Sequence, residues 1–434
     1  MSKITKKIFC VCFSIIILLL TETVTIAAVA VWVPESQKIH ISDLRVGNMD
    51  YWADLAYQPD QLGFVLPDWG NAEEITEQPA QWWGKSQSIY IPDLRVGEVD
   101  FWAQLIWHLE KGVFQLADWC QRGLEIFGPA FNAVDGFGDW RKNLEETSCF
   151  SNFAMIASDS DGVKEIATHD AEKIKEALSL GMNRTMVVIT NVLFTADFNP
   201  DGSLKNVRLR PDYKERIQRY SLYLHFYGSR NPWAFYVLDE PYSAAIQIGM
   251  SIREMREMLN TAIVAIKKVF PDSKTANGIA ITREDLEQEN ILGFPVPPNA
   301  VKEYGFPGFD IIAVYCYWPQ YRVFYPGSTL EDSKKVFQEK YLGNAKDNLL
   351  SGQKIVIVPG TFEFPGQEIS VEDYLDLANF YWCIARSNPK VVGIVPFLWP
   401  TTEGLVGLKN LPPEVQRAWE GIGRKIISRG ASLR

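Results

Sequence analysis

The stretch "AFYVLDEPY" at residues 234 to 242 joins the pattern of a buried strand to two adjacent carboxylates and a proline. Its first five residues are apolar or aromatic, as expected of a short strand in a sheet that is covered on both faces. Pro241 has no backbone N–H, so strand pairing should end there. The pattern therefore places Asp239 and Glu240 at the carboxyl-terminal tip of a buried strand.

Eight apolar runs of this kind alternate with amphipathic segments from residue 121 onward. The clearest helix begins at Ser251, which can form a capping box with Glu254, and it ends at Phe270 because Pro271 cannot continue it. Eight strands that alternate with helices predict an α/β fold, a (β/α)8 TIM barrel over residues 121–434. The runs are "LEIFGPAF", "FSNFAMIA", "RTMVVITNVLF", "WAFYVLDEP", "TANGIAI", "DIIAVYCYW", "KIVIVPGTF" and "VVGIVPFLW".

An open, doubly wound sheet is the alternative to a barrel. Such a sheet is expected to bind a nucleotide through a G-x-G-x-x-G turn after its first strand. The corresponding segment here is "FGPAFN", which departs from that pattern. The barrel is therefore the favoured prediction.

The polar residues at the strand tips point to a chemistry, because barrels of this type carry their active sites there. Asp239-Glu240-Pro241 resembles the Asn-Glu-Pro motif that ends strand 4 in the clan of retaining glycoside hydrolases with (β/α)8 barrels. The resemblance implies that Glu240 is the acid/base and that Asp239 contacts the sugar. A carboxyl group above the apolar column of Tyr236 and Leu238 should favour its protonated form, as a general acid requires. Alternatively, both acids cap a helix or pair with an arginine at the rim.

The same resemblance implies a glutamate nucleophile at the tip of strand 7, where this sequence has Pro359 and Gly360. The nearest acid is Glu363, which reaches the site if the strand continues past Gly360 and otherwise lies in a solvated loop. Glu403, in "LWPTTEG", is a further candidate. Without a second protein carboxylate, an N-acetyl group of the substrate can take that role. The "DxxDxDxE" run of chitinase-like barrels is absent.

Aromatic residues at two other tips are candidates for sugar binding. Strand 8 ends in "FLWP", and the resemblance implies that Trp399 is the floor of the subsite nearest the cleaved bond. Strand 6 ends in "YCYWPQY", with Tyr315 and Tyr317 on one face and Trp318 at the rim. Large rings at an open barrel mouth need a ligand or a lid to cover them. We therefore predict that Tyr317, Trp318 and Trp399 contact substrate, while Tyr315 is expected to fill the barrel.

An internal repeat occupies the region before the predicted barrel. "SQKIHISDLRVGNMDYWADL" from Ser36 recurs as "SQSIYIPDLRVGEVDFWAQL" from Ser86. Alternating apolar residues around a glycine turn predict about three short antiparallel strands in each copy, at 31–70 and 81–120. The copies resemble short β repeats of bacterial exported and surface proteins. Three functions remain open: carbohydrate binding, anchoring of the protein to a surface, or a spacer whose tryptophans form its core.

Residues 1–30 have the pattern of a secretory signal peptide. Three lysines precede "IFCVCFSIIILLL", and a small-residue cleavage pattern follows. The alternative is an uncleaved anchor, but the apolar run is shorter than the roughly 20 residues of a spanning helix. The expected location is therefore secreted, periplasmic or cell-surface, with no stable membrane span after cleavage. The net charge of −10 argues against nucleic acid as a partner.

Four cysteines remain after the predicted cleavage. Cys120 and Cys149 are predicted to form a disulfide, because each precedes an apolar run taken as one of two neighbouring strands. The alternative is that all four thiols are unpaired. Neither the cysteines nor the four scattered histidines have the spacing of a metal site, so no metal or cofactor is expected.

Together these features predict an exported glycoside hydrolase that acts on an oligo- or polysaccharide. Glu240 would be the general acid and Glu363 the nucleophile. The rival hypothesis is a catalytically inactive glycan-binding or adhesion protein on a barrel scaffold, which the missing strand-7 glutamate favours. The residues expected to bind sugar are Asp239, Tyr317, Trp318 and Trp399.

Overall fold

The computed structural model divides into two units. The first comes from Met1–Leu124 with Arg386–Pro389, and the second from Glu125–Ala385 with Lys390–Arg434. The predicted signal peptide lies outside the described residues apart from its last two positions. Within the part of the chain that is described, no helix combines the length and the apolarity needed to cross a bilayer. The described residues are 29–72, 79–97, 99–121, 123–200, 202–291, 293–367 and 369–432.

The N-terminal unit is an eight-stranded sheet in which each copy of the repeat supplies four strands, one more than predicted. The first copy contains β1 (Ala30–Val33), β2 (Lys38–Val46), β3 (Met49–Gln58) and β4 (Gly63–Asn71), with short 3-10 turns η1 (Pro34–Ser36) and η2 (Pro59–Gln61). The second copy contains β5 (Ala80–Trp83), β6 (Ser88–Val96), β7 (Val99–His108) and β8 (Val113–Gln121).

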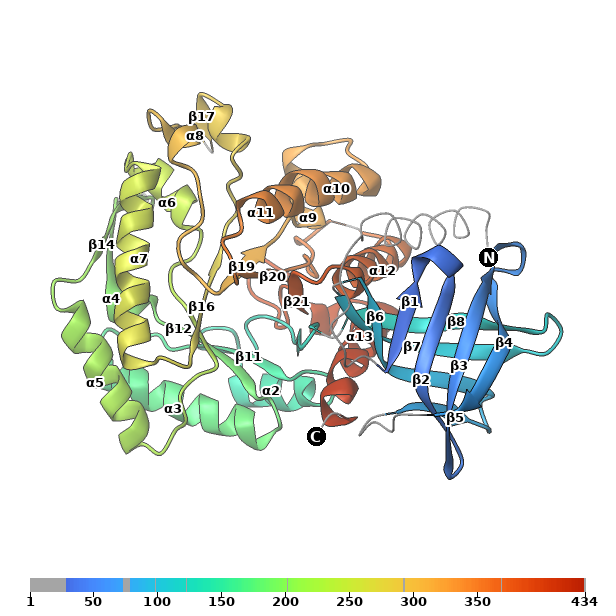
Figure 1. The fold of residues 1–434 in the computed structure, drawn as a ribbon. Helices are drawn as coiled ribbons and strands as arrows, with labels where there is room; N and C mark the ends of the chain where they lie inside the picture. The colour runs from blue at the N-terminus through green and yellow to red at the C-terminus, as the bar shows by residue number, and fades with distance from the viewer. Residues whose placement is uncertain are drawn as a thin grey trace. The chain divides into compact units, whose positions relative to one another are not determined.

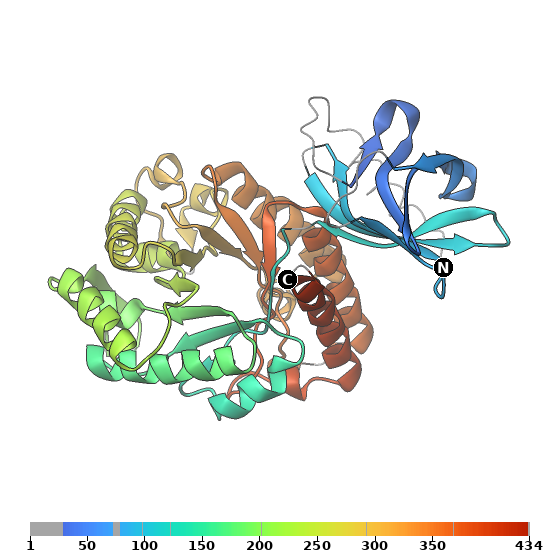
Figure 2. The ribbon, with the colours of Figure 1, turned by 60° about the horizontal axis from the view of Figure 1, so that its bottom comes forward.

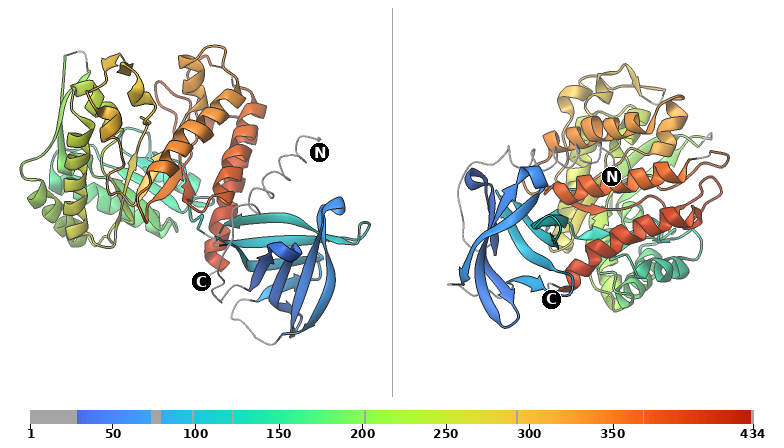
Figure 3. Two further views of the ribbon diagram at one scale, coloured as in Figure 1. Left: turned by 45° about the horizontal axis from the view of Figure 1, so that its top comes forward. Right: turned by 90° about the vertical axis from the view of Figure 1, so that its right-hand side faces the viewer.

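The two copies pair with each other in matching ways. The strand order is β1-β2-β3-β4-β8-β7-β6-β5. Two further parallel pairings, of β1 with β6 and of β2 with β5, join strands from opposite ends of this order. The sheet therefore curls (Figure 3). Inside it, Trp32 packs edge-on against Phe64 at 6.3 Å between ring centroids, and Trp82 packs against Phe114 at 6.1 Å. These two tryptophans therefore contribute to the core, as the spacer interpretation expects.

The C-terminal unit is built on a nine-stranded parallel sheet, and each of the eight predicted runs contains one of its strands (Figure 1). Its order is β10-β11-β12-β15-β16-β19-β20-β21-β9. The strands are β9 (Ile126–Phe127), β10 (Ala133–Val134), β11 (Phe153–Ala157), β12 (Arg184–Val188), β15 (Ala234–Tyr236), β16 (Lys274–Gly278), β19 (Ile311–Val314), β20 (Lys354–Ile357) and β21 (Val391–Ile394).

The two edges of this sheet belong to one stretch of chain, because β9 and β10 stand at opposite ends of the order but close together in sequence. The backbone N–H of Asn152, just before β11, donates to Phe127 O at 3.0 Å. On the other side, Ala130 N–H donates to Pro396 O at 2.9 Å. The sheet therefore curves so that residues 126–134 contact strands from both of its ends.

Helices lie outside the strands of this unit (Figure 2). The longer ones are α2 (Trp140–Ser148), α3 (Val163–Ser179), α5 (Tyr213–Phe226), α7 (Ile252–Val269), α12 (Val371–Ser387) and α13 (Pro413–Ser432). The shorter ones are α4 (Thr190–Leu193), α6 (Pro241–Ile248), α8 (Ala300–Glu303), α9 (Trp318–Phe324), α10 (Leu330–Val336), α11 (Gly343–Asn348), the π-helical η4 (Phe337–Leu342), and the 3-10 turns η3 (Asp285–Glu287) and η5 (Leu408–Asn410). Two small hairpins complete the unit, β13 (Phe194–Phe198) with β14 (Leu204–Leu209) and β17 (Asn290–Ile291) with β18 (Phe294–Pro295).

The predicted capping box at the start of α7 is confirmed. The Ser251 hydroxyl accepts from the Glu254 N–H, and the Glu254 carboxylate accepts from the Ser251 N–H, both at 3.1 Å. The helix ends at Val269, one residue before the predicted end. Two backbone donors of the first turn are thereby satisfied by side chains.

Replacing Ser251 by alanine should lower the free energy of unfolding by about 1 kcal/mol, because one helix-terminal N–H loses its acceptor. Urea denaturation measures the change. Thr261→Ala, at an exposed position inside the same helix, is the control and should shift stability by less than about 0.5 kcal/mol. Equal effects of the two substitutions would contradict a stabilising cap.

A buried polar cluster connects α3 and α5 to the carboxyl ends of β10 and β11. Asp170 is fully buried and accepts from the Ser158 hydroxyl at 2.6 Å and from the Tyr220 hydroxyl at 2.8 Å. Burial raises the pKa of Asp170 to about 6, although both hydrogen bonds act in the opposite direction. Lys173, also buried, donates to Asp135 at 2.7 Å. The cluster thus holds buried charges through several simultaneous contacts.

Candidate active site

The curved sheet of the C-terminal unit encloses a cavity of about 290 Å³. Most of the side chains that line it are apolar and come from the strands, including Phe153, Met186 and Ala313. Among the described residues of this lining, Asp239 and Glu240 are the two charged ones. The predicted acid pair thus lies at the cavity, at the carboxyl-terminal end of β15.

The backbone positions Glu240 in an unusual way. β15 ends at Tyr236, and Glu240 is the residue before α6, with left-handed torsions of φ 38° and ψ 56°. Residues other than glycine adopt this region at a cost of about 1–3 kcal/mol, and such residues are concentrated at functional sites. The Glu240 side chain makes no capping hydrogen bond to α6. Its carboxylate instead accepts a hydrogen bond from the Tyr315 hydroxyl at 2.9 Å.

The two carboxylates have different surroundings. Asp239 is exposed and accepts from the Tyr236 hydroxyl at 2.6 Å, and that hydroxyl accepts in turn from the Gly278 N–H at 3.1 Å. Glu240 is half-buried, and its pKa is raised, first by burial and then by the negative charge of Asp239. The Tyr315 hydroxyl opposes this rise. Burial therefore favours the protonated form of the Glu240 carboxyl group.

Aromatic rings form the wall beside the carboxylates. Tyr317 stacks between Tyr315, at 5.3 Å and 16°, and Phe397, at 5.0 Å and 15°. Phe131 meets Phe397 edge-on at 5.2 Å. All four rings line the cavity. Such flat faces can cover an apolar ligand surface or the C–H face of a sugar.

Gly360, beyond the end of β20 where the resemblance implied a glutamate, has little room for a side chain. A Cβ atom added at Gly360 would lie 2.9 Å from the Tyr317 Cβ. Any side chain at this position would therefore displace the Tyr317 ring. The space that the resemblance assigns to a nucleophile is next to a tyrosine in this protein.

Neither alternative nucleophile lies at the cavity. The backbone of Glu363 pairs with that of Val406 through hydrogen bonds of 3.0 and 2.8 Å. Burial and the neighbouring Glu363 carboxylate raise the pKa of the Tyr374 phenol. Glu403 is exposed. The expectation that Glu363 faces the acid across the barrel is thus not met, and neither residue is part of the lining.

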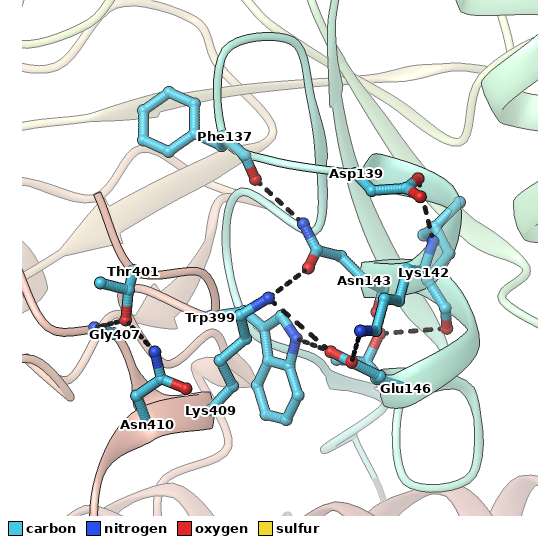
Figure 4. Close-up of polar contacts among 12 residues, drawn as sticks. Phe137, Asp139, Lys142, Asn143, Glu146, Trp399, Thr401, Gly407, Lys409 and Asn410 are labelled. Carbon is cyan, nitrogen blue, oxygen red and sulfur yellow. Dashed lines mark hydrogen bonds and ion pairs between the residues drawn. The ribbon is translucent and has the colours of Figure 1, made fainter. Parts of the chain in front are cut away.

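Two predicted sugar-binding tryptophans are also elsewhere. Trp399 is 4% exposed and packs 5.7 Å from Phe150, and its indole N–H donates to the Glu146 carboxylate at 3.2 Å (Figure 4). Trp318 is equally buried as the first residue of α9. Neither lines the cavity, where Phe397 presents its ring instead. Trp399 is not an open platform, because its side chain is buried and its indole N–H is bound to α2.

Phe397 and Phe131 are the site residues that sequence reasoning missed. The run "VVGIVPFLW" contains a signal for Phe397, because Val395 and Phe397 alternate at its end and both line the cavity. Phe131 follows a proline and an alanine in "GPAF", which lacks such a pattern. Of the predicted residues, Asp239, Glu240 and Tyr317 meet at the cavity.

The predicted Cys120–Cys149 disulfide would join the two units, and it stays a prediction. Cys120 is buried within β8 of the N-terminal unit, instead of preceding the first strand of the C-terminal unit, and Cys149 is an exposed free thiol after α2. Within the described ranges, no group of three or more His, Cys, Asp or Glu side chains could hold a metal ion.

Comparison with known proteins gives a likeness of fold. No family model and no curated protein matches the sequence. Similar solved structures include a β-glucuronidase of an uncultured Clostridium species (10% identity, TM-score 0.43, 88% of this chain and 67% of that chain). Others are a β-D-glucuronidase for Dictyoglomus thermophilum (10%, 0.42, 91% and 69%) and a glucosidase from Croceicoccus marinus (12%, 0.39, 70% and 68%). The chain spans about half, 52%, of a β-glucuronidase 2 from Bacteroides uniformis.

Proposed function

We propose that this protein is an exported glycoside hydrolase in which Glu240 is the general acid. The observation that carries this proposal is the half-buried Glu240 carboxyl group at the cavity, with its raised pKa and with Asp239 beside it. A general acid must hold a proton at the working pH and be placed to donate it to the leaving oxygen. When two neighbouring carboxyl groups lie in different environments, one can stay protonated and act as the acid while the other is ionised.

The scaffold proposed for this chemistry is a complete (β/α)8 barrel from about residue 121, preceded by the two β repeats. Support comes from the shared location of β9 and β10, and from the cavity lining, to which strands throughout the parallel sheet contribute. Export is proposed from the sequence pattern of residues 1–30. Active sites in such barrels lie at the carboxyl ends of the strands, where Glu240 follows β15.

In this mechanism Glu240 donates its proton to the glycosidic oxygen as the bond to the anomeric carbon breaks. Asp239, held by the Tyr236 hydroxyl, contacts the substituent at the sugar's second carbon. Among the described lining residues there is no third carboxylate, so the anomeric carbon is attacked by water or by an N-acetyl group of the substrate. A panel of aryl glycosides with and without 2-acetamido groups tests this. Hydrolysis of none of them would contradict the proposal.

Tyr315→Phe should shift the pH profile of hydrolysis. The Tyr315 hydroxyl lowers the pKa of Glu240, so its removal raises that pKa. Activity of a general acid is lost as pH rises through its pKa, and the alkaline limb of kcat/KM should therefore move to higher pH. Tyr321→Phe, on α9 and outside the described lining, is the control and should leave the limb in place. A downward shift in the Tyr315 variant would contradict the assignment of the acid.

A glycan-binding protein without catalysis is the second candidate, favoured by Gly360 at the tip of strand 7. This candidate predicts that the wild-type protein cleaves no member of the glycoside panel. It also predicts glycan-array binding that Phe397→Ala abolishes, because the Phe397 ring lines the cavity. Turnover that depends on Glu240 would exclude this candidate.

A further inference from the structure

The cavity below the carboxylates has the character of an apolar binding site. Met155, Met186, Val188 and Ala313 lie on strands inside the curved sheet, yet each remains partly exposed. Protein interiors are normally close-packed, with few voids larger than a water molecule. These side chains therefore face open space, and we call this inner part of the cavity the lumen.

The size of the lumen sets the size of its occupant. An apolar cavity of about 150 Å³ in another protein stays dry and binds benzene. The whole cavity here measures about 290 Å³. This volume matches a two-ring aromatic group or a branched alkyl group of similar size. A longer polymer would not fit inside it.

The polar groups define where a sugar can and cannot lie. The hydroxyls of Tyr236 and Tyr315 already donate to Asp239 and Glu240, and the other polar side chains of the described lining are only Tyr317 and Trp233. The described lining contains no Arg, Lys, His, Asn or Gln side chain. A sugar inside the lumen would leave hydroxyl groups without partners, which is unfavourable in an apolar environment. Two carboxylates also disfavour an anionic occupant, so the occupant is neutral and apolar, and the sugar lies on the solvent side of Glu240.

We propose that the lumen binds a neutral aromatic or branched alkyl alcohol, and that this alcohol is the leaving group of the glycosides that the protein hydrolyses. The leaving-group role rests on the proposed function, whereas binding of the free alcohol does not. When the glycosidic bond breaks, the Glu240 proton moves to the departing oxygen, and the alcohol stays neutral in the lumen. Water then supplies a hydroxyl to the anomeric carbon and a proton to Glu240.

Isothermal titration of the full chain with 2-naphthol tests the binding step. One molecule should bind per chain, and Ala313→Leu, which extends a larger side chain into the lumen, should weaken binding at least about tenfold. Ala196→Leu makes the same change at an exposed position of β13 and should bind as the wild type does. Val188→Ala widens the lumen and should bind 2-naphthol no less tightly.

A size series in the wild-type protein keeps the test independent of variants that fail to fold. Benzyl alcohol and 2-naphthol should bind, and 9-anthracenemethanol should bind at least about tenfold more weakly than 2-naphthol. No binding of 2-naphthol, or equal binding by folded Ala313→Leu protein, overturns the lumen site. Binding of 2-naphthol without cleavage of any 2-naphthyl glycoside supports the lumen site and overturns the hydrolase proposal. Hydrolysis of a glycoside without binding of 2-naphthol supports the hydrolase proposal and overturns the lumen site.

Discussion

Replacing Glu240 by glutamine is expected to lower the turnover of a soluble aryl glycoside by about 10²- to 10⁴-fold, the contribution that a positioned proton donor typically makes. The amide preserves the shape of the side chain and can still accept the hydrogen bond from Tyr315. It cannot deliver a proton to the leaving oxygen. Binding of the substrate, measured by titration, should therefore change little while kcat falls.

Glu363→Gln is the matched control for this experiment. Glu363 is half-buried and its carboxylate lies near Tyr374, outside the described lining of the cavity. Turnover by this variant should remain close to that of the wild type. A loss comparable to that of Glu240→Gln would mean that Glu363 reaches the substrate, and the interpretation of the strand-7 tip would then be wrong.

Lys173→Met is expected to lower the free energy of unfolding by about 1–3 kcal/mol, because it removes a buried donor and leaves its acceptors without that partner. Lys173 is 1% exposed and donates to the Asp135 carboxylate at 2.7 Å. Without it, the buried Asp170 loses the positive charge that lowers its pKa. Urea denaturation at neutral pH measures the loss. Lys164→Met, at an exposed position of the same helix, should change stability by less than about 0.5 kcal/mol.

The pH dependence of the free energy of unfolding distinguishes the loss of the Lys173 charge from a simple loss of packing. The pKa of Asp170 is raised from 3.8 to about 6 in the folded protein. A raised pKa means that the stabilisation from protonation is complete below pH 3.8 and is lost as pH rises toward 6. In Lys173→Met this loss should be larger and extend to higher pH. Asp170→Asn in the Lys173→Met background should remove most of that pH dependence, and a persistent dependence would point to another group.

Local patterns in the sequence were sufficient for the strands and for the position of the acid pair. Each of the eight apolar runs contains a parallel strand, and Ser251 forms the predicted capping box. These features depend on residues only a few positions apart, because side-chain periodicity, capping and proline breaks act within one or two turns of chain. The same reasoning correctly brought Asp239 and Glu240 to the cavity.

The side-chain positions of residues that follow a strand depend on contacts with residues distant in the sequence, which local sequence patterns do not reveal. The chain leaves the sheet after Phe397. The backbone N–H of Trp399 then donates to the backbone oxygen of Ala130 at 3.2 Å, and Ala130 lies more than 200 residues earlier in the sequence. The indole consequently points toward Glu146 of α2 and not into the cavity. The motif resemblance predicted Trp399 at this strand tip, whereas the ring that lines the cavity is that of Phe397.

The sequence by itself determined eight strands of the parallel sheet, the start of α7, and that two carboxylates stand at the end of β15, because short-range chemistry decides those features. Only the tertiary structure decided which side chains meet. The closeness of Gly360 to Tyr317 excludes a side chain at the tip of strand 7, and small residues such as Ala313 leave the lumen open. The physical reason is that packing in a curved sheet is set by residues from distant strands, whose volumes must fit together in three dimensions.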